Sequence, residues 1–189
     1  MAIRIKSKWH HSARNRPTAK SVSEHAGALA FIAWRLALEH AITLHKEGFE
    51  YDSDRERIGV ISEFCAFEVH VVDRLVFDRL QYEERELLIT TLGQRLADQM
   101  QDNLAELAGP GEYRAPFIAL LDDRCESYAR LSFEDGNPGF DFVRFFARSV
   151  LDVMGETQTN RWVLDQIMDI AAPEVVEKLA PSVERLLEG

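Results

Sequence analysis

Apolar residues recur at helical spacing through the segment 53–80. At about 100° per residue they fall on one side of a helix. Ser53 and Glu56 form the S-x-x-E capping box that commonly starts a helix. The regularly spaced apolar residues are Ile61, Phe64, Cys65, Val71, Val72, Leu75 and Val76. We therefore predict one long helix over 53–80, with its apolar side in the protein core.

The same periodicity predicts three further long helices over 21–46, 83–108 and 113–132. The first opens with a second capping box, at Ser21 and Glu24, and is apolar around most of its circumference. Such a helix should be central, or sandwiched between other elements or subunits. Short links between long helices favour antiparallel neighbours.

In the C-terminal third, the spacing of apolar residues predicts shorter helices over 140–154, 161–171 and 173–187. Pro181 should kink or break the last of them. No segment alternates as a strand does, so the predicted fold is all-α. It is an antiparallel helical bundle or array of four long helices with a helical C-terminal extension. We predict a single helical domain over 21–189, with a possible subdomain break at the loop 134–139.

The composition is typical of a soluble globular protein, with 46% hydrophobic and 29% charged residues. No uninterrupted apolar run reaches the ~18–20 residues that a membrane span requires, because Arg35 divides the best candidate. Cys65 and Cys125 are too few for a disulfide framework. We predict a cytoplasmic protein without a membrane span, in which both cysteines are buried as small hydrophobic residues.

The net charge of −10 conceals an asymmetry. Residues 1–23 hold six of the 22 basic residues and no acid, whereas all 32 acids follow them. We predict that 1–20 is a disordered basic arm, because it lacks apolar periodicity. The arm could instead contact phosphates or anionic lipid, or fold back on the acidic body. The acidic body itself makes nucleic-acid binding unfavourable.

Four polar residues lie on otherwise apolar helical faces, one on each long helix. They are His40, Glu68, Asn103 and Arg124. A buried charge is tolerated only when it is paired and hydrogen-bonded, so we expect Arg124 and Glu68 to form an ion pair. The four residues then form either a structural network that fixes helix register or an internal site for a small ligand or metal.

A second group lies on the opposite face of the 53–80 helix and mixes polar and aromatic residues. Its members are Glu63, Phe67, His70, Asp73 and Arg74. His70 and Asp73, three residues apart, are weak candidates for metal ligands or an acid–base pair. The same face could equally be solvated, or could be a subunit contact because aromatic residues flank it.

Motifs for nucleotide binding, metalloprotease chemistry and a nucleophile elbow are absent. No Glu-x-x-His occurs, which excludes the standard di-iron bundle site. We predict no cofactor.

Three classes of function are consistent with these patterns. The leading prediction is a non-enzymatic helical interaction or regulatory protein that forms a homodimer and binds an unassigned protein partner. The second is a small-ligand- or metal-binding bundle that uses His40, Glu68, Asn103 and Arg124. The third is an enzyme with a site at His70, Glu63 and Asp73, which requires these side chains to face a cavity.

Overall fold

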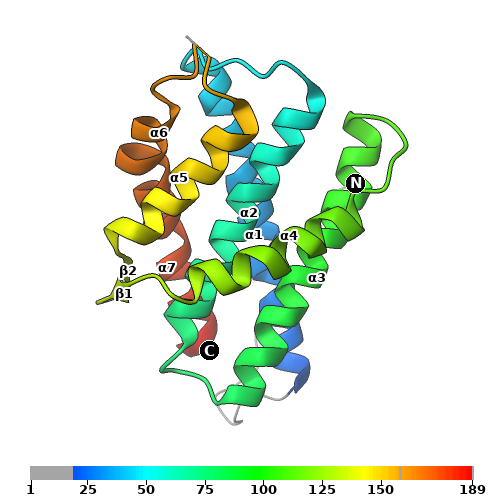
Figure 1. Cartoon of the computed structure of the whole chain (residues 1–189). Helices are drawn as coiled ribbons and strands as arrows, with labels where there is room; N and C mark the ends of the chain where they lie inside the picture. Colours follow the sequence, from blue (N-terminus) through cyan, green and yellow to red (C-terminus); the bar gives the residue numbers. More distant parts are fainter. Residues whose placement is uncertain (1–18, 158, 189) are drawn as a thin grey trace, which may run out of the picture.

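The computed structural model describes residues 19–157 and 159–188 and has an all-α fold (Figure 1). The predicted arm over 1–20 lies outside the described residues, except that Ala19 and Lys20 belong to the first helix. In chain order the elements are α1 (Ala19–Lys46), α2 (Asp54–Val76), α3 (Tyr82–Leu107), α4 (Arg114–Tyr128), β1 (Phe133–Glu134), β2 (Asn137–Pro138), α5 (Phe140–Met154), α6 (Val163–Gln166), the π-helical η1 (Ile167–Ala171) and α7 (Ala172–Glu188).

Helix α2 is the centre of the fold. It packs against α1, α3, α4, α5 and α7, and α4 and α5 run obliquely across it (Figure 1). All residues from Val60 to Val69 are buried. Both faces of this helix are therefore inside the protein, although its sequence pattern predicted only one buried face.

Of the two predicted N-terminal capping boxes, the one at the start of α2 is confirmed and the one at the start of α1 is not. Ser53 has extended backbone angles (φ −156°, ψ 160°), and its Oγ accepts a hydrogen bond from the Glu56 N–H at 3.3 Å. The Glu56 carboxylate accepts from the Asp52 N–H at 2.7 Å. Helix α1 begins at Ala19, so Ser21 lies inside it and the cap predicted there is wrong.

The predicted loop 134–139 contains a short β-hairpin, so the expectation of no strands is wrong at this point. Strands β1 and β2 pair antiparallel, with Phe133 opposite Pro138. The two turn residues, Asp135 and Gly136, have φ of 50° and 77°. Positive φ at both positions is the geometry of a two-residue hairpin turn. Whether the loop separates two subdomains stays a prediction.

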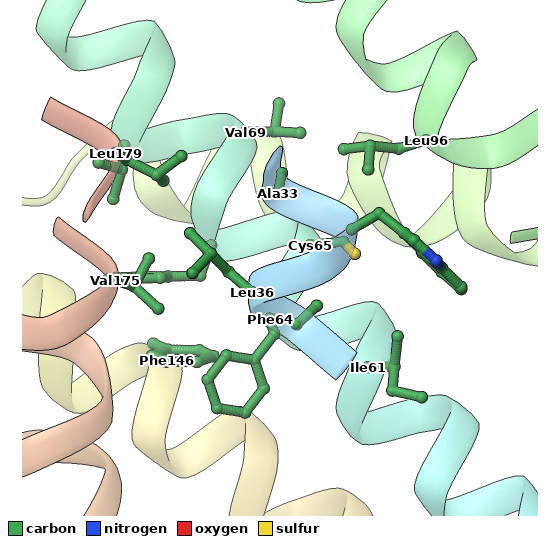
Figure 2. Close-up of a cluster of buried hydrophobic side chains, with 14 of the residues drawn as sticks. Ala33, Leu36, Ile61, Phe64, Cys65, Val69, Leu96, Phe146, Val175 and Leu179 are labelled. Atoms are coloured by element: carbon green, nitrogen blue, oxygen red, sulfur yellow. The ribbon is translucent and has the colours of Figure 1, made fainter. Parts of the chain in front are cut away.

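The core takes side chains from helices before and after this hairpin. Figure 2 shows residues of α1, α2, α3, α5 and α7 meeting around Phe64 and Cys65. The predicted helix 140–154 is confirmed as α5. Helix α7 continues through Pro181, so of the two predicted outcomes the break is wrong, and the kink stays a prediction. The helix tolerates proline because its apolar face is anchored in the core on both sides, at Leu179 and Val183.

Helix α1 packs on α3, α2 and α7, and its outer side faces away from the core. On that outer side Phe31 and Ile42 are 55% and 54% exposed. Among the described residues, Val22–Lys46 is the one stretch long and apolar enough to cross a membrane, with a mean hydropathy of 1.3. Half of that stretch is buried in the fold, and core helices pass the same test. The absence of a membrane span therefore stays a prediction.

Candidate functional site

Arg124 pairs with Glu63 and not with Glu68, so the predicted ion pair is wrong. Its Nε donates to Glu63 Oε2 at 3.0 Å and its Nη2 donates to Oε1 at 2.6 Å. Glu63 is only 2% exposed. Glu68 is five residues further along α2, about 140° around the helix. Helix α4 covers the Glu63 side, so the guanidinium of Arg124 reaches that carboxylate.

Glu68 is fully buried, and neither of its carboxylate oxygens has a hydrogen-bond partner among the described residues. Burial raises the pKa of this carboxyl well above its ordinary value of 4.5. A raised pKa favours the protonated, uncharged form of the carboxyl, which costs less to bury in an apolar core than a carboxylate does.

Asn103 does not join an internal network either. Its Nδ2 donates to the backbone carbonyl of Gln99, one turn earlier in α3, at 2.7 Å. The Asn103–Gln99 bond lies within α3, whereas the Arg124–Glu63 pair joins α4 to α2. Glu68 has no hydrogen-bond partner among the described residues. The four predicted residues therefore form neither the expected common network nor a shared pocket, because the helices that carry them face different neighbours.

The second predicted group forms a polar seam between α2 and α4. The Glu63–Arg124 pair lies at one end of this seam. In the middle, the ring of His70 lies 4.6 Å from the ring of Tyr128, centroid to centroid. At the other end, Arg74 Nη2 donates to the Tyr128 carbonyl oxygen at 2.8 Å. Because Tyr128 is the last residue of α4, Arg74 supplies a donor to the free carbonyls at that helix end.

This seam is inside one chain, so the predicted subunit contact on that face is wrong for Glu63 and Phe67. Phe67 is fully buried against Tyr128, Phe142 and Phe146. Asp73 lies beside the seam and binds Arg85 of α3 through both of its oxygens, each at 2.7 Å. The reason is that α4 and α5 cover the side of α2 that its pattern left for solvent or a partner.

His70 and Tyr128 are the two seam residues with unpartnered polar atoms. His70 Nε2 and the Tyr128 hydroxyl are both buried without a hydrogen-bond partner among the described residues. Burial lowers the pKa of His70 to about 4 and raises the pKa of Tyr128 well above its ordinary value. Both rings are thus neutral at physiological pH. The carboxylate of Asp73 is held by Arg85, so His70 and Asp73 do not act as a pair.

Two concave sites adjoin the predicted residues. A groove of about 560 Å³ lies between α2, α3 and α4, with Glu63 on its floor beside apolar residues that include Ile58, Met100 and Phe117. A smaller cavity of about 230 Å³ lies between α1 and the η1–α7 segment and includes His40. We call this second site the His40 cavity.

His40 is 4% exposed, and its Nε2 is buried without a partner among the described residues. Its ring is parallel to that of Phe64, with a centroid distance of 5.2 Å and an interplanar angle of 3°. Burial, and then Lys178, lower the pKa of His40, so the imidazole is neutral at pH 7. Gln166 and Glu174 also line the cavity. Sequence reasoning missed both, because nothing in their local pattern distinguishes them from other polar residues of a helix surface.

The two cysteines differ in environment. Cys65 is fully buried, and burial raises the pKa of its thiol, which makes it a poor nucleophile. Cys125 is exposed on α4, so the prediction that both are buried is wrong for this residue.

These observations define an all-α helical array with a polar seam inside it and, beside a small cavity, a histidine whose Nε2 has no hydrogen bond to the residues that the structure describes. Comparison of the chain with protein-family models, with curated protein sequences and with solved structures finds no significant match.

Proposed function

We propose that the protein is a non-enzymatic helical interaction protein that acts as a homodimer through the outer side of α1. The observation that carries the proposal is a stripe of residues spaced alternately by three and four along that side. The stripe consists of Ala28, Phe31, Arg35, Leu38, Ile42 and His45. This is the spacing of a helix–helix seam. Phe31 and Ile42 are both more than half exposed, and both lie on this one stripe.

Charge along the same side favours a second copy of the chain as the partner. Glu24 lies near the start of α1 and Lys46 at its end, while Arg35 and Glu39 lie between them. An antiparallel, two-fold arrangement that places Phe31 opposite Ile42 brings Arg35 of one chain near Glu39 of the other, and leaves Glu24 and Lys46 about one helical turn apart. The commonest homodimers have this isologous symmetry. Lys178 donates to Oε1 of Glu39 at 3.3 Å, which leaves the second carboxylate oxygen of Glu39 able to accept from Arg35 of the other chain.

Shape adds support to this pairing. In the antiparallel arrangement Phe31 of one chain faces Ile42 of the other. A hollow of about 450 Å³ lies beside Ile42, and His45, Tyr51 and Arg57 also line it. An aromatic ring inserted into such a hollow is a common anchor of protein interfaces.

The non-enzymatic part of the proposal rests on the polar seam. Glu63 and Asp73, the two carboxylates of the predicted enzyme site, are each paired with an arginine of another helix, Arg124 and Arg85. They fix how α2, α3 and α4 pack, which is a structural task.

The test is the mass of the protein in solution, measured by sedimentation equilibrium over a range of concentrations. The wild-type chain should sediment with twice its own mass. The double variant Phe31→Ser/Ile42→Ser should be monomeric, with the dissociation constant raised at least about tenfold, because two anchors lose their apolar contact.

A matched control is the double variant Phe140→Ser/Trp162→Ser, which removes two apolar side chains of similar exposure (65% and 58%) on other elements. Its dimer should be unchanged. A wild-type mass equal to one chain at every concentration would refute the proposal, and so would equal effects of the two double variants.

A further inference from the structure

The His40 cavity is separate from the proposed dimer contact and has the features of a binding site. It is partly open to solvent and is bounded by the C-terminal part of α1 on one side and by α6, η1 and α7 on the other. Its volume of about 230 Å³ is below the range usual for drug-sized ligands, so it fits only a small molecule. The residues that give it chemical character are His40, Thr43, Glu47, Gln166, Ile170 and Glu174.

His40 contributes a polar atom that lacks a partner. The residue is more than nine-tenths buried, and its Nε2 has no hydrogen bond among the described residues. Buried polar atoms in folded proteins nearly always have a partner in the protein, in ordered water or in a ligand. The ring lines the cavity, and its plane is fixed by the stacking on Phe64. A neutral imidazole in this position can accept a hydrogen bond at its unprotonated nitrogen.

The charge around the cavity is negative. Glu47 and Glu174 both line it, and neither forms an ion pair among the described residues. Lys178 is close enough to affect His40 electrostatically, but its ammonium is bound to Glu39 at 3.3 Å. The two carboxylates outnumber the one ammonium near the cavity, so the cavity repels an anion and attracts a cation.

The η1 segment forms part of the cavity wall. Ile170 and Ala171 of this π-helical turn line it, together with Leu44 of α1, and they give it an apolar side. Single π-helical turns are rare and frequently occur at functional sites. An apolar wall opposite two carboxylates suits a ligand that is partly hydrocarbon.

We propose that the His40 cavity binds a small organic cation that carries N–H donors, such as an alkylammonium or guanidinium compound. Its N–H groups donate to Glu47 and Glu174, and the ligand lies beside the His40 ring, which lines the same cavity. Its carbon chain lies against Ile170. A metal ion fits less well, because the described residues contain no group of three His, Cys, Asp or Glu side chains placed to hold one.

The test follows the His40 imidazole resonances by NMR while the full-length protein is titrated with n-butylammonium or methylguanidinium. Sodium chloride at equal ionic strength serves as the reference. Both probes should shift the His40 resonances in a saturable way, and the salt should not. Titration with zinc and magnesium completes the series. A saturable shift with either metal but with neither organic probe would overturn the proposal, as would no shift with any probe.

Variants locate the site. Glu174→Gln should weaken the binding of both probes by about tenfold, because it removes one charge-assisted hydrogen bond. Glu174 is exposed, so this variant is expected to fold, and its amide spectrum verifies that. Glu184→Gln, an exposed position elsewhere on α7, is the matched control and should bind as the wild type does. Equal affinities for the two variants would overturn the assignment of the ligand to this cavity.

Discussion

The buried carboxyl of Glu68 makes the stability of the protein depend on pH in a direction that can be calculated. The side chain is fully buried and has no hydrogen-bond partner among the described residues. Its pKa in the folded chain is raised well above 4.5 by burial. The substitution Glu68→Gln keeps the shape of the side chain and removes its ionisation, so it isolates the effect of the proton.

The sign depends on which state releases the proton first. Below the ordinary pKa of 4.5 the carboxyl is protonated in both states, and Glu68 contributes no dependence on pH. Above it the unfolded chain ionises while the folded chain must keep its proton. The free energy of unfolding therefore falls as pH rises, by about 1.4 kcal/mol per pH unit, until the raised folded pKa is reached. From pH 5 up to that folded pKa, wild type should therefore lose about 1.4 kcal/mol per pH unit relative to Glu68→Gln.

The assay is urea denaturation of wild type and Glu68→Gln at each pH unit from pH 5 to pH 8. The useful quantity is the difference between their free energies of unfolding, because contributions from His40 and His70 are present in both proteins and cancel. Glu177→Gln, on the exposed side of α7, is the control and should run parallel to the wild type. A difference between wild type and Glu68→Gln that stays constant over this range would show that Glu68 is ionised or solvated in the folded protein, and would refute the reasoning.

Two further predictions concern the polar seam. Arg124→Leu should lower the free energy of unfolding by about 3 kcal/mol, because it leaves the buried Glu63 carboxylate without its partner. The double variant Glu63→Leu/Arg124→Leu should recover a large part of that loss, and a double variant as unstable as the sum of both single changes would contradict this. Burial lowers the pKa of His70 to about 4, so between pH 6.5 and pH 4 the unfolded chain binds a proton at this residue and the folded chain does not. The free energy of unfolding therefore falls as pH falls from 6.5 toward 4. His70→Phe, which keeps an aromatic ring on Tyr128, should therefore lose about 3 kcal/mol less than wild type between pH 6.5 and pH 4 in the same denaturation assay, and equal losses would refute the assignment.

Element bounds were predictable where the sequence carries a strong local signal. Helix α5 has its predicted range because a glycine precedes and follows it, and Gly155 adopts a φ of 75° that most residues avoid. Ser53 and Glu56 fixed the start of α2 by the same kind of local chemistry. Helix α4 ends at Tyr128, four residues before the predicted end at residue 132. The chain turns over 129–132, and the spacing of apolar residues does not reveal that turn.

The partner of Arg124 was not predictable from one helix at a time. Periodicity shows that Glu63 and Glu68 lie on different faces of α2, but it ranks the faces by apolar content alone. Glu63 lay on the face with fewer aliphatic residues, and solvent was the natural expectation for it. Glu63 is nevertheless buried, because α2 is covered on its polar face as well as on its apolar face. The helix that covers the polar face is α4, and it supplies Arg124 as the partner of Glu63.

The His40 cavity could not be predicted from the sequence, for a different reason. Its second wall comes from residues more than a hundred positions later in the chain. Its geometry also depends on the π-helical turn η1, which inserts one residue into the helical register and rotates the residues after it by about 100°. A regular helix over 161–171, as the pattern predicts, would direct Ile170 and Glu174 elsewhere.

The placement of both proposed sites on α1 makes the two proposals independent. His40 lies nine residues after Phe31, about 180° around the helix, so the cavity and the dimer stripe point in opposite directions. A second copy on the outer side would leave the cavity open, and a ligand in the cavity would not touch the stripe. Loss of the dimer in Phe31→Ser/Ile42→Ser with unchanged binding of methylguanidinium would thus support both sites. Failure of either experiment alone would remove one proposal and leave the other standing.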